Sequence, residues 1–128
     1  MSRSETGVWG ENTAADYLVQ LGYTILERNF HARSGELDII ASIERYICFI
    51  EVRTRTEGAL VSGAESIDIR KMRRIFRTAC QWLMLNPSEL QPRFDVIEIT
   101  AAASRPLTVK NLNHITNAFG AEVCNEIF

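Results

Sequence analysis

Two short stretches decide the fold: Gly35-Glu36-Leu37-Asp38-Ile39-Ile40 and Cys48-Phe49-Ile50-Glu51-Val52-Arg53. In both stretches every second residue is apolar, and charged residues occupy some of the positions between. This period of two predicts adjacent β-strands. Strict alternation puts Glu36 and Asp38 on one face of the first strand and Leu37 and Ile39 on the other. The link at residues 42–46 is short enough for an antiparallel hairpin.

The register of this hairpin follows from its loop. A loop of two or four residues pairs residues whose numbers sum to 89, which sets Asp38 opposite Glu51 and Glu36 opposite Arg53. Two carboxylates directly across a ladder repel each other. A raised pKa on one of them or a bound divalent cation would relieve that repulsion. A loop of odd length would shift the register by one residue, and Asp38 would then no longer lie opposite Glu51.

Length and composition predict one ordinary globular domain spanning residues 1–128. The chain is 46% hydrophobic and 23% charged, as is usual for globular proteins. It has no apolar run near the ~18 residues of a membrane span and no signal-peptide pattern at its N-terminus. Its three cysteines are widely spaced with no CxxC pair, which favours neither a zinc site nor a disulfide framework. We therefore expect a cytoplasmic protein.

The remaining elements follow from periodicity and stop signals. A helix is predicted over residues 7–21, with Gly22 after its end, and a strand over 23–30. A flexible loop follows the acidic hairpin at about 54–65, then a helix over 66–85 with Ser66 as N-cap, and a strand over 93–100. The tail at 107–119 fits a fifth strand, a short helix or both. The fold class is α/β: a central mixed sheet of about four to five strands flanked by helices, in the order α-β-β-β-α-β.

Several polar residues have two readings. Glu11 lies in the apolar stripe of the first helix, so it either meets a functional partner or reaches water at the first turn. Asp95 is expected at the surface and His31 in an exposed turn, and His114 is expected at the surface or in packing.

Basic residues gather in one segment of an acidic chain. The net charge is −2, but residues 53–77 hold seven basic and three acidic residues, so that segment is net +4 and the remainder net −6. Arg55, Arg70, Lys71 and Arg74 would contact a phosphate backbone if the segment binds nucleic acid. The simpler interpretation of a charge run alone is a solvated helix face.

A longer set of motifs resembles a known family. The motifs are Gly10-Glu11, Ala14, Tyr17-Leu18, Gly22-Tyr23, Arg28-Asn29-Phe30, the two acidic strands through Arg55, Lys71, Arg74 and Arg93-Phe94-Asp95-Val96. In this order they resemble the bacterial YraN-like family of predicted endonucleases, within the PD-(D/E)xK, restriction-endonuclease-like superfamily and distantly like archaeal Holliday-junction resolvases. The resemblance spans residues 8–119.

The resemblance implies a nuclease that uses Mg²⁺ or Mn²⁺ on DNA, with branched or structured DNA among its candidate substrates, and by analogy with resolvases a homodimer. Asp38 and Glu51 would hold the metal with Glu11, and the Val52 carbonyl would add an oxygen. Glu36 would orient Arg53 or bind water.

One position departs from the family motif, which has lysine where this chain has Arg53. Lysine can lose its proton near a nucleophilic water, whereas arginine stays charged. Arg53 would still clamp a phosphate, and Lys71 is a candidate for the missing amine.

Three functions are therefore compared. The first is a metal-dependent nuclease. The second is a nucleic-acid-binding module of the same fold that has lost turnover. The third is an interaction domain whose acids form buried salt bridges, Glu36 with Arg53 and Glu51 with Arg55 or Arg74.

Overall fold

The computed structural model describes residues 4–58 and 68–127. Its elements are α1 (Glu5–Gln20), β1 (Thr24–Ala32), β2 (Gly35–Ile43), β3 (Tyr46–Thr56), α2 (Ile69–Leu85), β4 (Gln91–Ala101), β5 (Val109–Phe119) and the 3-10 helix η1 (Ala121–Ile127). The predicted order α-β-β-β-α-β is confirmed. The tail forms a fifth strand followed by a short helix.

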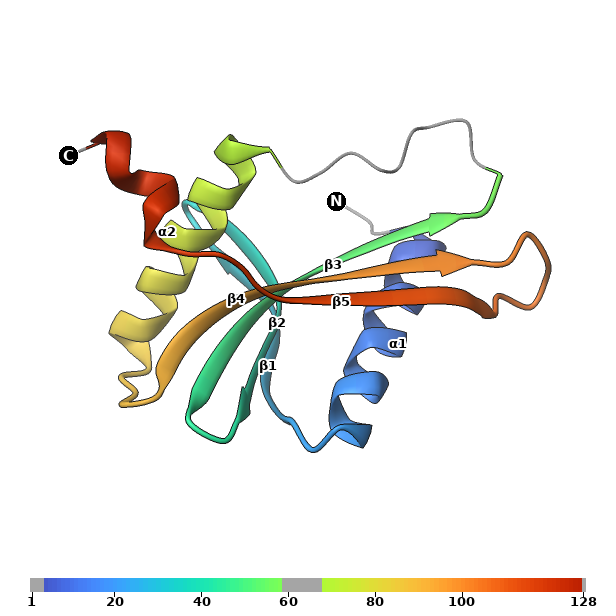
Figure 1. Ribbon diagram of the computed structural model, residues 1–128, viewed down its shortest axis with the longest axis horizontal. Coiled ribbons are helices and arrows are strands. Elements are labelled where there is room, and N and C mark those ends of the chain that lie inside the picture. The colour runs from blue at the N-terminus through green and yellow to red at the C-terminus, as the bar shows by residue number, and fades with distance from the viewer. Residues whose placement is uncertain (1–3, 59–67, 128) are drawn as a thin grey trace.

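The five strands form one mixed sheet in the order β1-β2-β3-β4-β5. Neighbouring strands are antiparallel except β3 and β4, which run parallel. The crossover between these two passes through α2, as a parallel pair requires. Figure 1 shows the twisted sheet lying between α2 and α1. The fold is α/β and compatible with the restriction-endonuclease-like class.

Each helix covers its own hydrophobic core, and β3 supplies both. Ile47 and Phe49 pack toward α2, where Ile75 and Trp82 meet them. The alternate residues Cys48 and Ile50 pack toward α1. Burial of β3 on both faces explains the near-continuous apolar run in its sequence.

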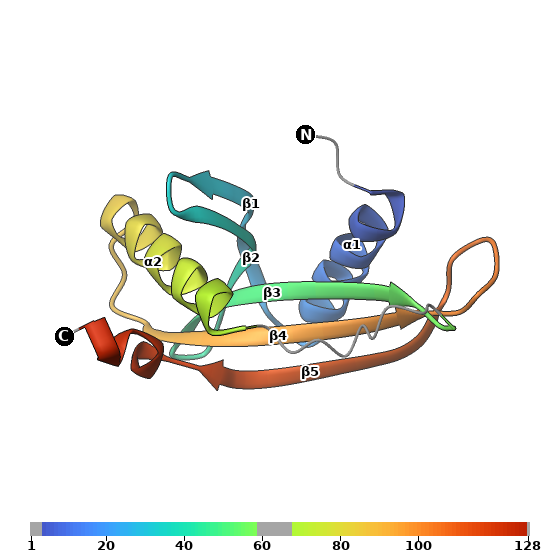
Figure 2. The same ribbon diagram turned by 90° about the horizontal axis from the view of Figure 1, so that it is seen from above.

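The hairpin register is confirmed where the two strands pair. Ile43 lies opposite Tyr46 and Ile39 opposite Ile50, so paired numbers sum to 89. The recorded pairing ends at Ile39 and Ile50, however, one step before Asp38 and Glu51. Beyond it the β1–β2 hairpin curves away from β3, as Figure 2 shows.

This bend changes the predicted alternation of β2. Leu37 packs in the core under α2, whereas Ile39 packs in the core under α1. Strict alternation put both on one face, and that prediction is wrong. On β1, Asn29 has a left-handed backbone with φ of 56°, between residues 28 and 30 that pair with 39 and 37. The bend therefore involves both strands of the hairpin.

Some predicted boundaries are corrected. Residues 54–56, assigned to the flexible loop, belong to β3, which continues because the parallel ladder with β4 runs to Thr56 and Ala101. The rest of that loop from 59 lies outside the described residues. Helix α2 begins at Ile69 with Asp68 as its N-cap, and Ser66 is also outside the described part. His31 lies in β1 rather than in a turn.

Of the helices in the described ranges, none is long and apolar enough to cross a membrane.

Candidate functional site

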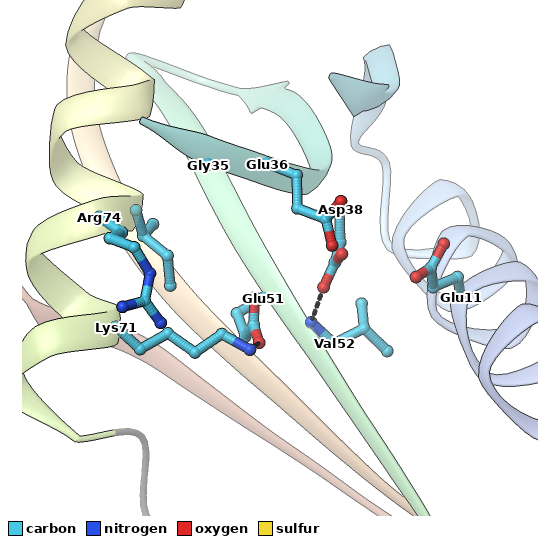
Figure 3. A pocket seen from close by; sticks show the side chains of 9 residues that line it. Glu11, Gly35, Glu36, Asp38, Glu51, Val52, Lys71 and Arg74 are labelled. Atoms are coloured by element: carbon cyan, nitrogen blue, oxygen red, sulfur yellow. Dashed lines mark hydrogen bonds and ion pairs between the residues drawn. The ribbon is translucent and has the colours of Figure 1, made fainter. Parts of the chain in front are cut away.

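A pocket of about 290 Å³ opens between α2 and the bend of β2, over the middle of β3. Figure 3 shows the side chains around it. The lining residues are Glu11, Gly35, Glu36, Asp38, Glu51, Val52, Lys71, Arg74 and Ile75. The tertiary fold thus brings together the acids predicted from the sequence with two of the predicted basic residues.

Asp38 lies where β2 separates from β3, and its side chain takes the place of a backbone hydrogen bond between the two strands. Its Oδ2 accepts a hydrogen bond from the backbone N–H of Val52 at 2.8 Å. Burial, and then the negative charge of Glu51, raise the pKa of Asp38 to about 7, although the Val52 N–H and Lys71 oppose the rise. The predicted repulsion between the two carboxylates is therefore present, with the raised pKa that was one of its expected consequences.

Glu51 projects from β3 on the α2 side and is nearly buried. Its Oε2 lies 2.6 Å from Nζ of Lys71, and the exposed fractions of the two side chains are 9% and 46%. The interaction-domain alternative paired Glu51 with Arg55 or Arg74, but the ion-pair partner of Glu51 in the structure is Lys71. The interaction-domain alternative requires buried salt bridges between the acids and arginine. The structure instead places a flexible lysine side chain beside Glu51 at an open pocket.

Helix α2 positions the basic side of the pocket. The carboxylate of Asp68 accepts a hydrogen bond from the Lys71 N–H at 2.9 Å, a standard way to start a helix. Lys71 and Arg74 are three residues apart and so lie on one face of the helix. Both side chains point toward the pocket in Figure 3.

The tip of the β1–β2 hairpin is fastened to the same helix. Ser34 Oγ lies 2.8 Å from Thr78 Oγ1 and donates to Gln81 Oε1 at 2.6 Å. Gly35 has φ of 150°, and a Cβ there would lie 3.3 Å from Thr78 Oγ1. This close approach curves the hairpin toward α2 and leaves the pocket at the base of the bend.

Glu11 reaches the pocket from α1, on the opposite side of β3. Gly10 permits this, because a Cβ at that position would overlap the side chain of Thr54 on β3. In Figure 3, Glu11 and Glu51 lie on opposite sides of Val52. Within the described ranges no three His, Cys, Asp or Glu side chains form a group able to hold a metal ion. A role for Glu11 as third ligand therefore stays a prediction.

The other predicted residues lie farther out. Glu36 lines the pocket, is 65% exposed, and pairs with Nδ1 of His31 at 3.2 Å. Arg53 lies beside Glu98 of β4. The described lining of the pocket does not include Arg53, Arg55 or Arg70. Their assigned roles in catalysis and nucleic-acid binding stay predictions.

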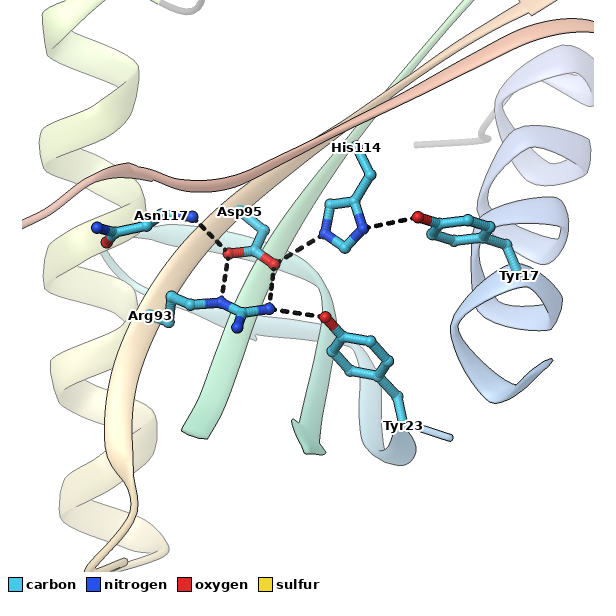
Figure 4. Close-up of polar contacts among 6 residues, drawn as sticks. All are labelled: Tyr17, Tyr23, Arg93, Asp95, His114 and Asn117. Carbon is cyan, nitrogen blue, oxygen red and sulfur yellow. Dashed lines mark hydrogen bonds and ion pairs between the residues drawn. The ribbon is translucent and has the colours of Figure 1, made fainter. Parts of the chain in front are cut away.

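Sequence reasoning missed a second polar cluster, shown in Figure 4. Asp95 is fully buried rather than at the surface. Its carboxylate accepts two hydrogen bonds from Arg93, at 3.0 and 2.9 Å, and one from the Asn117 N–H at 3.0 Å. His114 bridges it to Tyr17, with Nε2 2.9 Å from Asp95 and Nδ1 3.0 Å from the Tyr17 hydroxyl.

A signal for this burial was present in the sequence. Asp95 shares its face of β4 with Ile97 and Ile99, both buried under α1, so period-two alternation predicts an inward carboxylate. Its partners were not foreseeable, because Tyr17 and His114 come from distant segments. The cluster joins α1 to β4 and β5 and lies on the face of the sheet opposite to Lys71.

Comparisons with known proteins place the chain in a family. The model of the family described as "Uncharacterised protein family UPF0102" matches residues 10–99. A UPF0102 protein of Caldanaerobacter subterraneus is 39% identical over 93% of this chain and 98% of its own length. One from Chlorobium phaeobacteroides is 42% identical over 90% and 94%, and one from Clostridioides difficile is 38% identical over 93% and 100%. The chain therefore belongs to the uncharacterised family UPF0102, the YraN-like family that its motifs resemble.

Proposed function

We propose that this protein is a metal-dependent nuclease of the cytoplasm that hydrolyses phosphodiester bonds in DNA, branched or structured DNA in particular. One observation carries the proposal. Asp38 and Glu51 sit together at an open pocket whose opposite wall presents Lys71 and Arg74. Adjacent acids suit a divalent cation, and basic side chains suit a phosphate.

The residues present fit Mg²⁺ or Mn²⁺. Mg²⁺ is commonly held by one or two carboxylates with waters and substrate phosphate completing its shell. Asp38 and Glu51 supply two carboxylates whose mutual repulsion a cation would relieve, and after burial the charge of Glu51 is the largest cause of the raised pKa of Asp38. Glu11 and the Val52 carbonyl are proposed to add to this set. A pocket of about 290 Å³ has room for several waters, since each takes ~30 Å³.

The roles of the chain's own residues follow from their positions. Arg74 is proposed to bind a nonbridging phosphate oxygen, and exposed Arg55 and Arg70 to contact phosphates farther along the strand. The Val52 N–H fixes the orientation of Asp38, and Glu36 lies at the exposed mouth where it can bind water. When bound, the metal would neutralise phosphate charge and activate a water for attack.

A second candidate is a DNA-binding module without turnover, favoured by Arg53 at the motif's lysine position. Arginine cannot take a proton from water. This module would bind DNA with strong salt dependence but would not cleave it. Restoration of cleavage by Arg53→Lys would support this account.

In the first test, Mn²⁺ is titrated into the protein and the heat of binding is measured. We expect one site in the wild type and a loss of at least tenfold in affinity, about 1.4 kcal/mol, in Asp38→Asn. Asp16→Asn is the matched control, because Asp16 is exposed on α1 and the chemical change is identical. Wild-type affinity in both variants would contradict a metal site at Asp38.

The second test is cleavage of junction, flap, single-stranded and duplex DNA with Mg²⁺ or Mn²⁺. We expect metal-stimulated cleavage with the junction or flap as the best substrate, absent in Asp38→Asn and present in Asp16→Asn. Salt-sensitive binding without cleavage would favour the module instead. Cleavage unchanged by Asp38→Asn would refute the proposed site.

A further inference from the structure

We infer that Lys71 is the internal counter-ion of this site: Glu51 holds its ammonium group until a divalent cation displaces it, and the released ammonium then binds the substrate phosphate. The inference rests on the proposed function and assigns Lys71 a role within it. It makes metal binding and phosphate binding two consequences of one side-chain movement.

The ion pair itself is the first support. Lys71 Nζ lies 2.6 Å from Glu51 Oε2, at the place where a cation between Asp38 and Glu51 would bind. The Lys71 side chain is 46% exposed whereas that of Glu51 is 9% exposed. The acid is therefore fixed in the sheet, while the amine reaches it on a solvated, flexible stem that can move away.

The charge balance is the second support. Two adjacent carboxylates carry more negative charge than one ammonium can neutralise, so a divalent cation is the better counter-ion for the pair. Once Glu51 is bound to metal, the ammonium loses its partner. In Figure 3 Lys71 and Arg74 lie on the same wall of the pocket, so a phosphate there would meet both.

The environment of the helix end is the third support. The first turn of α2 contains Arg70 and Lys71, and the N-cap Asp68 supplies one carboxylate just before it. Cations at this end oppose the helix dipole, which favours an anion. The Asp68 carboxylate offsets one of these two cations, and a phosphate would offset the Lys71 ammonium once Glu51 has released it. It would also explain how an amine enters the site from α2 when the strand position two after Glu51 holds Arg53.

Titration of Mn²⁺ into wild type, Lys71→Met and Lys110→Met tests the displacement step. Lys110 is the matched control, because it also pairs with a glutamate, Glu57, at 2.5 Å, but outside the pocket. At pH 8 we expect Lys71→Met to bind Mn²⁺ about tenfold more tightly, about 1.4 kcal/mol, because no ammonium competes. Lys110→Met should match the wild type, and Lys71→Gln should match Lys71→Met.

The outcomes separate the two proposals. Equal or weaker Mn²⁺ binding by both Lys71 variants, with wild-type binding intact, would overturn the role of Lys71 alone. Absence of Mn²⁺ binding in every protein would overturn the metal site and this inference with it. Far-UV circular dichroism with and without Mn²⁺ confirms that each variant is folded.

Binding of a fluorescent DNA junction in Ca²⁺ or EDTA tests the phosphate step without turnover. We expect Ca²⁺ to tighten DNA binding by the wild type and by Lys110→Met, and to do so much less in Lys71→Met and Lys71→Gln. An undiminished Ca²⁺ effect in the Lys71 variants would show that the ammonium does not bind the phosphate.

Discussion

Two aspartates show how neighbours decide the chemistry of a side chain. Asp38 lies beside Glu51 in a pocket, and burial with that adjacent charge raises its pKa to about 7. Asp95 is also buried, which raises its pKa, but hydrogen bonds from His114, Arg93 and the Asn117 N–H and the charge of Arg93 outweigh burial and lower it. The first carboxylate still needs a cation, whereas the second already has one. Only the first is therefore proposed as a metal ligand.

The raised pKa of Asp38 predicts that the metal-free protein loses stability as pH rises. A folded pKa above the unfolded value of 3.8 means that its contribution is complete below about pH 4 and is lost as pH rises through about 7. Each unit of difference between the folded and unfolded pKa corresponds to about 1.4 kcal/mol in the free energy of unfolding. Urea unfolding in EDTA from pH 5 to 8 should show a decreasing free energy of unfolding.

Asp38→Asn should flatten this decrease, because the amide does not titrate, while Asp16→Asn should retain it. Mn²⁺ should restore stability at pH 8 in the wild type by binding the folded state. An equal slope in wild type and Asp38→Asn would contradict the assignment.

For Asp95 we expect that replacement of the carboxylate destabilises the folded protein. Asp95→Asn leaves the Arg93 side chain, which is 14% exposed, without its carboxylate partner, and breaking a buried ion pair from one side costs about 3–5 kcal/mol. Thermal and urea unfolding at pH 7 should show a loss of this size. The lowered pKa of Asp95 also means that its contribution is lost as pH falls through the folded pKa.

Glu98→Gln is the control on the same strand, since Glu98 is only partly buried. It should change the free energy of unfolding far less than Asp95→Asn. Comparable losses in both variants would show that the cluster in Figure 4 has no special weight.

At the scale of elements, α1 must approach β3 closely to bring Glu11 to the pocket. In Gly10→Ala the added Cβ would overlap Thr54 Oγ1 and lie 2.8 Å from Thr54 Cβ. Overpacking of this kind costs about 1–3 kcal/mol, which exceeds the ~1 kcal/mol gained from the better helix propensity of alanine. We expect lower stability, measured by urea unfolding, and weaker Mn²⁺ binding if Glu11 is a ligand.

Asp16→Ala makes a helix-favouring change at an exposed position of α1 and should not destabilise the protein. Gly10→Ala with stability equal to wild type would mean that α1 can shift away from β3 at no cost.

The β1–β2 hairpin shows the limit of pattern reasoning for a single element. Residue numbers summing to 89 correctly predicted the pairs from Ile43 to Ile39. Alternation failed one step later, because the hairpin tip is held by Thr78 and Gln81 of α2. These contacts join residues more than forty positions apart, and a period of two carries no information about them.

At the scale of the whole molecule, two hydrophobic cores share one central strand. Trp9 packs against the core under α1 and Trp82 within the core under α2. Because Phe49 and Ile50 of β3 belong one to each core, loss of either core exposes β3. We expect both to unfold in one cooperative transition.

Fluorescence of the single-tryptophan variants Trp9→Phe and Trp82→Phe tests this expectation. After correction for the stability of each variant, the two urea transitions should coincide with that of far-UV circular dichroism. Trp82→Phe also removes the hydrogen bond from Nε1 to Glu27 at 2.7 Å, so it should be the less stable variant. Separated transitions would show that the cores unfold independently.

The sequence by itself determined the order of the elements, the hairpin register and the acids of the pocket. These depend on periodicity, turn length and burial of apolar residues, which are local in the chain. The tertiary structure decided the bend at Asp38, the pairing of Glu51 with Lys71 and the burial of Asp95 among Arg93, His114 and Tyr17. Those features depend on which distant side chains meet across the two faces of the sheet, and only the packing of α1 and α2 on β3 fixes that.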